Sequence, residues 1–121
     1  PVIAPIGLGE DGEGYNVNAD TVAGEVANAL KAEKLVFLTN VTGIMRDAND
    51  ERSLLSSLHV NDVDALIAEG IIQGGMIPKM RACVRSVKGG VRKTHIIDGR
   101  IPHALLLEVF TQEGVGTEIV Q

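Results

Sequence analysis

The strongest constraint on the fold is an alternation of segments with helical periodicity and short runs of strand-forming residues. Residues 34–39 (KLVFLT) and 93–98 (KTHIID) have the length and the branched side chains of buried strands. Residues 19–31 precede the first of these runs, and their apolar residues recur three and four positions apart, as on one face of a helix. Strands that alternate with helices predict βαβ units, and therefore an α/β fold, an αβα sandwich whose largely parallel sheet is covered by helices on both faces.

The other segments fit the same architecture. The turn signals of glycine, proline and the Asp-Gly step mark most of the boundaries between them. The further elements expected are strands at 1–6, 15–17 and 117–120, a hairpin turn at Asp11-Gly12, a polar loop at 40–53, a helix that Asn61 caps and Gly70 ends, a helix with Pro78 at its first position and Gly89-Gly90 beyond its end, and a mostly buried helix at 102–110.

Composition narrows the class of protein. The chain has 121 residues, 45% of them apolar and 22% charged, which predicts one folded domain with a core of its own. The net charge of −5 and the presence of only three aromatic residues argue against nucleic acid as a partner. Cys83 is the only cysteine, which excludes an internal disulfide and a cysteine-rich metal site.

Targeting signals are not evident in this sequence. We find neither an apolar stretch of membrane-spanning length nor a signal peptide, so a cytoplasmic protein is expected. The sequence starts at Pro1 without a methionine and runs directly into a strand-like segment. We therefore expect the chain to be part of a longer protein, a hypothesis that the whole gene would test.

A glycine motif near the start matches a dinucleotide fingerprint only by its letters. Gly7, Gly9 and Gly12 in GLGEDG have the G-x-G-x-x-G spacing, but the fingerprint requires a helix directly behind it to hold a pyrophosphate. Here the flanking Glu10 and Glu13 would repel a pyrophosphate, and a strand is expected next. We interpret the motif as a hairpin turn.

Three polar residues in YNVNAD are candidates for ligand binding. Alternate side chains of an extended segment share a face, so Asn16, Asn18 and Asp20 point the same way where a strand runs into a helix. Such a row suits a ligand with carboxylate, amide or phosphate groups. The alternative is that Asn18 or Asp20 caps the helix, which accounts for one of the three residues.

Lys79 occupies an unfavourable position in the sequence GGMIPKM. A cation in the first turn of a helix opposes the helix dipole and costs about 0.3–1 kcal/mol. Gly74-Gly75 lets the backbone approach a ligand, and a helix N-terminus favours an anion, so a phosphate at this point would make the lysine favourable. The alternative is an ordinary surface lysine.

The remaining chemical groups carry weaker signals. LTNVTGI, residues 38–44, follows a predicted strand at the edge where open α/β sheets bind ligands, although an ordinary loop is the alternative. The three histidines lack metal-ligand spacing and are interpreted as structural, and Cys83 as a core residue. Arg81, Arg85 and Lys88 are interpreted as a solvated helix face, with phosphate binding as the alternative.

Taken together and in this order, these stretches resemble the amino-acid kinase family. The residues that carry the resemblance are NVNAD at 16–20, AEKLVFLTNVTGI at 32–44, GIIQGGMIPKM at 70–80, HIIDGR at 95–100 and EGVGTEI at 113–119. Among its members, those that act on N-acetyl-L-glutamate in arginine biosynthesis are the most similar. The resemblance implies that residues 1–121 form the nucleotide-binding half of such an enzyme, which uses ATP and Mg²⁺, the metal held mainly through the phosphates, to convert the side-chain carboxylate to an acyl phosphate.

The resemblance also implies roles for individual residues. Lys79 corresponds to the lysine that stabilises the transferring phosphoryl group, and Asp20 to the aspartate that orients catalytic lysines. Substrate binding is implied for Asn16 and Asn18. Nucleotide binding is implied for Asn40, Val41, Thr42, Gly43, Ile44, Met45, Ile71, Ile72, Gln73, Met76 and Lys79, and binding of L-arginine as an inhibitor for His95, Glu113, Gly114 and Gly116.

Several alternatives remain open at this point. Asn40 stands where the family often has aspartate, and the tail at 113–119 has the alternative reading of a closing turn. A kinase for aspartate, glutamate or carbamate is the nearest competing function, and a non-catalytic ligand-sensing domain is a competitor of another class. We expect the full-length enzyme to be a homo-oligomer, and we expect this chain alone not to turn over, because the family's other half supplies further phosphate-binding groups.

Overall fold

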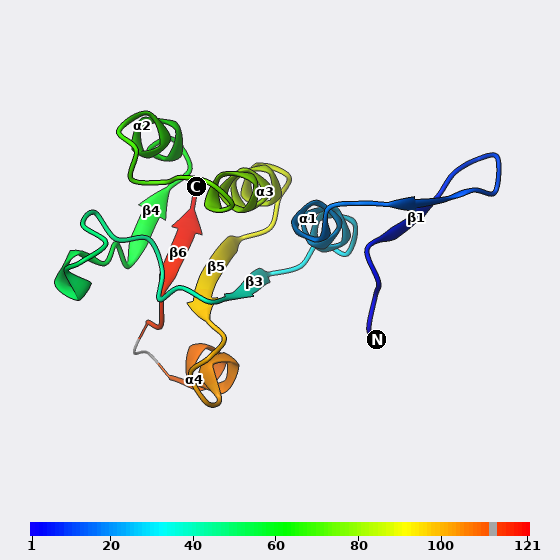
Figure 1. The fold of residues 1–121 in the computed structure, drawn as a ribbon. Helices are drawn as coiled ribbons and strands as arrows, with labels where there is room; N and C mark the ends of the chain where they lie inside the picture. Colours follow the sequence, from blue (N-terminus) through cyan, green and yellow to red (C-terminus); the bar gives the residue numbers. More distant parts are fainter. Residues whose placement is uncertain (112–113) are drawn as a thin grey trace.

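A four-stranded sheet with helices on both faces forms the body of the molecule (Figure 1). The computed structural model describes residues 1–111 and 114–121. In chain order the elements are β1 (Ile6–Leu8), β2 (Gly14–Asn16), α1 (Ala19–Ala29), β3 (Lys34–Thr39), a 3₁₀ turn (Glu51–Ser53), β4 (Ser57–His59), α2 (Val63–Ala68), α3 (Met76–Lys88), β5 (Lys93–Asp98), α4 (Ala104–Phe110) and β6 (Thr117–Val120).

The sheet has the strand order β3-β5-β6-β4 and is mixed. β3 and β5 are parallel, with Lys34 opposite Lys93 at one end and Thr39 opposite Asp98 at the other. β4 and β6 are also parallel, whereas β5 and β6 are antiparallel. The predicted α/β fold is therefore confirmed, and the sheet is parallel in its two outer pairings and antiparallel in its central one.

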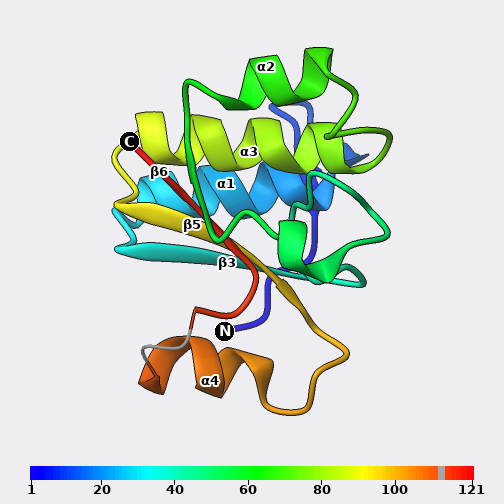
Figure 2. The same cartoon turned by 90° about the vertical axis from the view of Figure 1, so that its left-hand side faces the viewer.

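One face of the sheet is covered by α1 and α3, which run side by side, with α2 beyond them (Figure 2). α3 contributes an apolar stripe to the core there, and Met80, Cys83 and Val87 are at most 2% exposed. Phe37 of β3 and Ile96 of β5 belong to the same core cluster. These three residues of α3 lie three and four positions apart in the sequence, so they share the side of the helix that faces the sheet.

Local sequence signals explain the limits of α1. The Asn18 side chain accepts a hydrogen bond from the Thr21 backbone N–H at 3.1 Å, so Asn18 caps the helix. Gly24 lies against α3, where an added Cβ would approach the Ser86 Oγ to 3.0 Å. The helix ends two residues earlier than expected, because Lys31 adopts a left-handed conformation with φ of 50°.

The N-terminal segment differs from the prediction. Residues 1–5 are not a strand; the first strand is β1, and it pairs only with β2, as an antiparallel hairpin in which Ile6 lies opposite Asn16. Residues 1–4 have no neighbouring strand in the described part of the chain to pair with. The turn itself is confirmed, with Gly12 at a φ of 82°, and the strand β2 follows the glycine motif, as expected.

Two helix starts were predicted wrongly. Asn61 does not cap α2, which begins at Val63 after Asp62, because the Asn61 backbone N–H donates to His59 Nδ1 at 3.2 Å and lies in a turn. Pro78 is the third residue of α3, not the first. Proline is tolerated there because the first four N–H groups of a helix have no intrahelical partner. The ends at Gly70 and Gly89 are confirmed. β4 was not predicted.

The last helix, α4, covers the opposite face of the sheet, and its predicted burial is wrong. Only Ala104 and Glu108 are buried, whereas Leu106 is 52% exposed and Phe110 79% exposed. The helix starts at Ala104, two residues later than expected. The apolar side of α4 faces away from the sheet, because the carboxylate of Glu108 turns inward to contact basic side chains on the sheet.

Among the residues that the structure describes, no helix has both the length and the hydropathy that crossing a bilayer requires.

Candidate active site

Two functional candidates meet where the N-termini of α1 and α3 lie together. Because α1 leads into β3 and α3 into β5, both helices begin at the edge where these parallel strands end. Asp20 lies in the first turn of α1 and Lys79 in the first turn of α3. The Lys79 Nζ is 2.5 Å from the Asp20 Oδ1, and the two side chains are only 18% and 21% exposed. Residues 59 positions apart thus form one ion pair.

Lys79 has a second neighbour that stabilises its charge. Its ammonium lies 4.8 Å from the ring centroid of Phe37, on the adjacent strand β3. A cation over an aromatic face is attracted by the ring quadrupole. The carboxylate of Asp20 and the ring of Phe37 together offset the unfavourable helix dipole at Lys79, which is therefore not a solvated surface lysine. Sequence reasoning missed Phe37, whose only signal was its place in an apolar run.

The two asparagines of the same segment have different settings. Asn18 caps α1 through its Oδ1, so the capping alternative is confirmed for this residue. Asn16 ends β2 and is exposed on the hairpin, which projects from the body of the molecule (Figure 1). Their roles in substrate binding stay predictions.

A cavity of about 230 Å³ lies beside the start of α3. Its wall is formed by the loop that follows β3, by the segment before α3 and by the first residue of that helix. The residues that line it are Val41, Gly43, Ile44, Met45, Ala48, Ile71, Gln73 and Met76. All of them except Ala48 were predicted as nucleotide contacts, so the structure brings together two segments that are separated by 25 residues in the sequence.

Four of the predicted nucleotide contacts, Lys79 among them, do not line this cavity. Ile72 is 1% exposed and belongs to the core, while Asn40 is exposed and Thr42 is half-buried. An adjoining hollow of about 420 Å³ shares Met45 and Gln73 with the cavity and continues along the loop at 45–48. The cavity therefore continues into this hollow on the side formed by residues 45–48.

A close approach between two backbones fixes the loop that follows β3. An added Cβ at Gly43 would come within 2.6 Å of the Thr117 Oγ1 and 2.8 Å of the Leu54 Cδ1. The Ile44 N–H donates to the same Thr117 hydroxyl at 2.8 Å. Gly116, with φ of 86°, lies on the other side, where a Cβ would overlap the carbonyl oxygen of Ile96. Packing alone therefore requires glycine at both positions.

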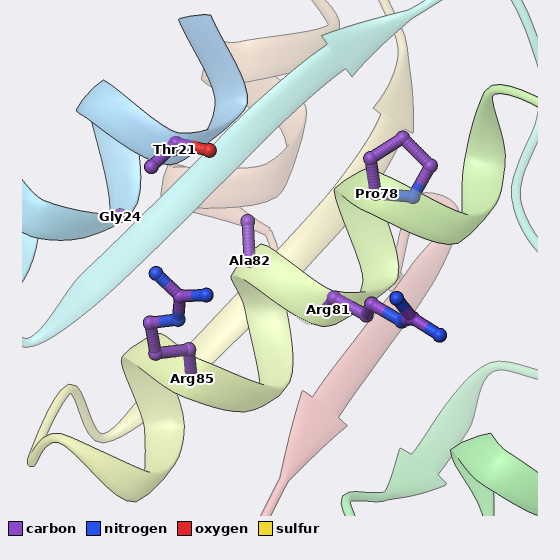
Figure 3. Close-up of a pocket in the computed structure, with 6 residues that line it drawn as sticks. All are labelled: Thr21, Gly24, Pro78, Arg81, Ala82 and Arg85. Atoms are coloured by element: carbon purple, nitrogen blue, oxygen red, sulfur yellow. The ribbon is translucent and has the colours of Figure 1, made fainter. Parts of the chain in front are cut away.

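A smaller hollow of about 150 Å³ lies between α1 and α3 on the side away from the sheet (Figure 3). It results from the small residues Gly24 and Ala82, and the guanidinium of Arg85 reaches toward α1 while Arg81 turns away. Arg85 pairs with Glu25 at 3.3 Å, and both side chains are more than half exposed. The predicted solvated face at Arg81, Arg85 and Lys88 is confirmed, since all three residues are exposed.

A second cluster of charges lies under α4, on the other face of the sheet. The Glu108 Oε1 is 2.8 Å from both the Lys34 Nζ and the His95 Nδ1. Glu118 pairs with Lys93 at 3.1 Å, and its Oε2 is 3.7 Å from the His95 Nε2. The like charges Lys34 and Lys93 are direct neighbours across β3 and β5, an arrangement that requires nearby carboxylates.

The electrostatics of this cluster follow from its burial. Burial lowers the pKa of His95, and the charges of Lys34 and Lys93 act in the same direction against the carboxylate of Glu108. For Glu118, burial alone raises the pKa, but its hydrogen bond to Lys93 and the charge of that lysine outweigh this and leave the pKa below its usual value. The His95 Nε2 is buried and has no hydrogen-bond partner among the described residues.

These charged groups line a cavity of about 460 Å³ together with Gly114 and Gly116. Three of the four residues predicted to bind arginine, including His95, therefore face one space. Glu113 lies outside the described residues. Sequence reasoning missed Lys34, Lys93, Glu108 and Glu118, because their proximity depends on strand pairing and on the inward orientation of α4.

The other reactive side chains contribute to packing or to the surface. Cys83 is 0% exposed, as predicted for a core residue, and burial raises the pKa of its thiol to about 11. His59 and His103 are exposed. Within residues 1–111 and 114–121, no three histidine, cysteine or acidic side chains gather as a metal site would require.

Comparison with known proteins finds a matching family and curated relatives. Residues 1–98 match the model of the amino acid kinase family. Acetylglutamate kinase from Heliobacterium modesticaldum is 64% identical over all 121 residues, and the enzyme of that name from Moorella thermoacetica is 63% identical over 120 residues. The chain spans only 41% and 40% of the length of these two relatives.

Solved structures share the fold. N-acetylglutamate synthase from Neisseria gonorrhoeae, complexed with coenzyme A and L-arginine, superposes with a TM-score of 0.86 and 30% identity; the match covers 98% of this chain and 27% of that one. Carbamate kinase from Giardia lamblia bound to AMP-PNP superposes with a TM-score of 0.73 at 19% identity over 96% of this chain and 41% of that one, a likeness of fold alone. With the matched model covering most of its length, the chain belongs to the amino acid kinase family.

Proposed function

We propose that residues 1–121 form the nucleotide-binding half of a cytoplasmic acetylglutamate kinase in arginine biosynthesis. This enzyme transfers the γ-phosphoryl group of ATP to the side-chain carboxylate of N-acetyl-L-glutamate. The ion pair of Lys79 with Asp20, at the meeting point of two helix N-termini and beside an apolar cavity, is the observation that carries the proposal. The relatives named acetylglutamate kinase, 64% and 63% identical, support the choice of substrate.

The proposed reaction makes modest demands on the protein. A carboxylate oxygen of the substrate attacks the γ-phosphorus, the bond between that phosphorus and the oxygen bridging to ADP breaks, and its electron pair leaves with ADP. No proton has to move, because the carboxylate is already a nucleophile. Catalysis therefore consists of alignment and of neutralising negative charge on the moving phosphoryl group.

Lys79 supplies the neutralising charge in this proposal. Its ammonium has three donors, of which Asp20 engages one, so others remain for phosphoryl oxygens. Asp20 and the ring of Phe37 hold the ammonium in place while the substrates come and go. Mg²⁺, bound mainly through the phosphates, would supply further positive charge.

The nucleotide occupies the cavity next to this pair. Met76 lines the cavity and lies three residues before Lys79, so both side chains share one side of the first turn of α3. An adenine ring suits the apolar wall, and the phosphates then extend toward Lys79 along the start of the helix. Gly74-Gly75 adds no side chain that would block this approach: a Cβ at either position would meet nothing within 4 Å.

N-acetyl-L-glutamate binds on the other side of Lys79 in this proposal, where β2 runs into α1. Asn16 is exposed there and offers an amide to the acetyl or carboxylate groups. The Oδ1 of Asn18 already accepts from Thr21, which leaves the amide NH₂ of Asn18 to donate to the substrate. The substrate carboxylate thus enters close to the helix N-termini, which favour anions.

The competing functions are tested by one assay on the complete gene product. We expect MgATP-dependent formation of an acyl phosphate, trapped as the hydroxamate, with N-acetyl-L-glutamate and much less with aspartate, glutamate or carbamate. A preference for one of these substrates would replace the proposed substrate, and no turnover with any of them would favour a ligand-sensing domain. The isolated chain of 121 residues is expected to show no turnover, and acyl phosphate formed by it would contradict this expectation.

We also propose that the cavity under α4 binds L-arginine as a feedback inhibitor. Carboxylates of Glu108 and Glu118 face the cavity and suit a guanidinium, and the synthase that superposes on this chain was complexed with L-arginine. Calorimetry with L-arginine on the complete gene product tests the site. Glu113→Ala and Glu118→Gln should each weaken binding, whereas Glu25→Gln, on the far side of the sheet, should not. Unchanged affinity in the first two variants would exclude this site.

We further propose that the complete enzyme is a homo-oligomer. Its mass in solution, measured by light scattering, tests this point, and a monomeric mass would contradict it.

A further inference from the structure

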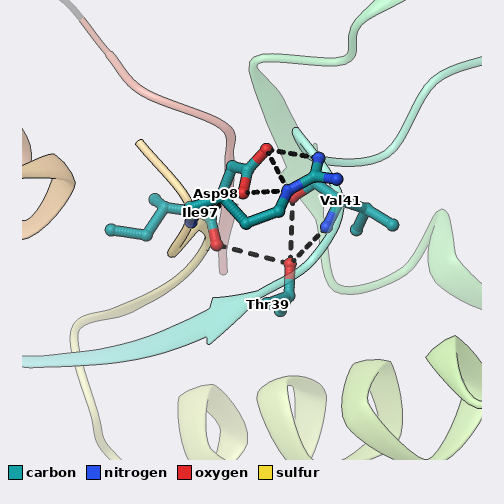
Figure 4. Close-up of polar contacts among 5 residues, drawn as sticks. Thr39, Val41, Ile97 and Asp98 are labelled. Atoms are coloured by element: carbon teal, nitrogen blue, oxygen red, sulfur yellow. Dashed lines mark hydrogen bonds and ion pairs between the residues drawn. The ribbon is translucent and has the colours of Figure 1, made fainter. Parts of the chain in front are cut away.

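The loop that follows β3 is held at its first residues by one hydroxyl group (Figure 4). Thr39, the last residue of β3, uses its Oγ1 to accept from the Val41 backbone N–H at 3.1 Å and to donate to the Val41 carbonyl at 2.9 Å. The same oxygen lies 3.3 Å from the carbonyl oxygen of Ile97 on β5. A single side chain thus joins the start of the loop to the neighbouring strand.

Further hydrogen bonds, from the backbone and from side chains, hold the ends of the two strands. The Gly99 N–H donates to the Thr39 carbonyl at 2.8 Å, immediately beyond the last residue pair of the two strands, Thr39 and Asp98. Asp98 in turn accepts three hydrogen bonds from the side chain of Arg100, at 2.7 to 3.2 Å. The two strands therefore end at a fixed point, from which the loop at 40–45 departs.

The position of this loop matters because it forms one wall of the cavity beside α3. Val41, the residue that Thr39 holds, is part of that wall, and so are the three residues from Gly43 to Met45. Thr39 itself does not line the cavity. Thr39 can therefore orient the wall of the cavity without contacting a ligand in it.

We propose that Thr39 is a positioning residue for the nucleotide: its hydroxyl sets the path of residues 40–45 and thereby shapes the cavity for the adenosine part of ATP. The inference rests on the proposed function of the cavity. Valine has nearly the same shape as threonine but can neither accept from the Val41 N–H nor donate to a carbonyl. Serine retains both abilities.

The test measures ATP binding by calorimetry on the complete gene product and on three variants. Thr39→Val should weaken ATP binding by about tenfold, the scale of one lost hydrogen bond, whereas Thr39→Ser should stay within about twofold of wild type. Thr94→Val is the matched control, since Thr94 is a buried threonine near the other end of β5. It should not change ATP affinity.

Steady-state kinetics separate positioning from general damage. Thr39→Val should raise the KM for ATP by about tenfold and leave the KM for the carboxylate substrate unchanged. Affinity for inorganic tripolyphosphate should also be unchanged, because that ligand makes no use of the adenosine cavity. Equal losses for ATP and tripolyphosphate would overturn the inference, and so would a loss in Thr39→Ser as large as in Thr39→Val.

Hydrogen exchange gives a measurement that does not depend on any variant. The amide of Val41 should exchange slowly in the wild-type protein with and without ATP, because its N–H is bonded to Thr39. Fast exchange in the absence of ATP would overturn the inference even if Thr39→Val failed to fold. A wild-type protein without measurable ATP binding would instead contradict the proposed function of the cavity.

Discussion

The two faces of the sheet are covered by helices of opposite construction. On one face, α3 buries Met80, Cys83 and Val87 and turns three basic residues outward, Arg81, Arg85 and Lys88. On the other face, α4 buries the carboxylate of Glu108 and turns leucine and phenylalanine outward. Both helices are rich in apolar residues, so apolar content alone does not decide which side of a helix faces a sheet.

The cause of the difference lies in the strands. Alternate residues of β3 and β5 point to opposite faces, so Phe37 and Ile96 face α3, while Lys34, Lys93 and His95 face α4. An apolar face is best covered by an apolar helix stripe. A face with two lysines side by side is stabilised by a helix that presents a carboxylate, as Glu108 does.

The largest expected effect is a difference between α3 and α4 in how much one apolar side chain contributes to stability. Met80→Ala removes a fully buried side chain from α3 and should lower the free energy of unfolding by about 2–5 kcal/mol. The matched change Leu106→Ala on α4 removes a half-exposed side chain and should cost about 0.5 kcal/mol or less. Urea unfolding of both variants measures the difference. Equal losses would mean that the outer side of α4 is packed against protein in solution.

The next effect tests the charge cluster that holds α4. Glu108→Gln keeps the shape of the side chain but removes the carboxylate beside the Lys34 Nζ and the His95 Nδ1. This change should lower the free energy of unfolding by about 1–3 kcal/mol. Glu25→Gln is the control, because Glu25 is exposed. A Glu108→Gln variant as stable as wild type would show that the buried carboxylate does not hold the helix.

A pH titration sharpens the same comparison with a smaller effect. Since burial lowers the pKa of His95 below its unfolded value, the unfolded state binds more protons, and stability falls as the pH drops below the ordinary histidine pKa of about 6.5. His95→Gln should lose this part of the pH dependence, whereas Met80→Ala should keep it. If the stability of His95→Gln had the same pH dependence as wild type, His95 would not be its cause.

The smallest effect is expected from the exposed ion pair on the helical face. Arg85 and Glu25 link α3 to α1, but both side chains are more than half exposed. A double-mutant cycle on the two residues should give a coupling free energy of at most about 0.5 kcal/mol. A coupling above 1 kcal/mol would mean that solvent screens this pair less than its exposure indicates.

Sequence patterns predicted the parts of the fold where one physical effect dominates. The bounds of β3, β5 and β6 followed from short runs that contain branched apolar side chains and have the length of a strand. The orientation of α4 could not be predicted, because residues 104–110 have apolar side chains on nearly every side, and their one charged residue would ordinarily face water. Strand β4 was missed because three residues after a polar loop carry too short a pattern.

The candidate site was predictable to the extent that it violates a local rule. A lysine in the first turn of a helix indicated a compensating anion, which we expected to be a phosphate. The structure places the carboxylate of Asp20 next to this lysine. Phe37 and Thr39 could not be found in this way, since both are ordinary strand residues and their contacts depend on how β3 lies against α3 and β5. The cluster under α4 likewise depends on strand register.

The most direct test of the central claim is the turnover number of Lys79→Gln in the complete gene product. Lys88→Gln, in the last turn of the same helix, is the matched control. If the ammonium of Lys79 neutralises the moving phosphoryl group, kcat should fall by about 10²–10³-fold in Lys79→Gln with an unchanged unfolding midpoint, and should stay at the wild-type value in Lys88→Gln. A kcat for Lys79→Gln within a few-fold of wild type would contradict the claim.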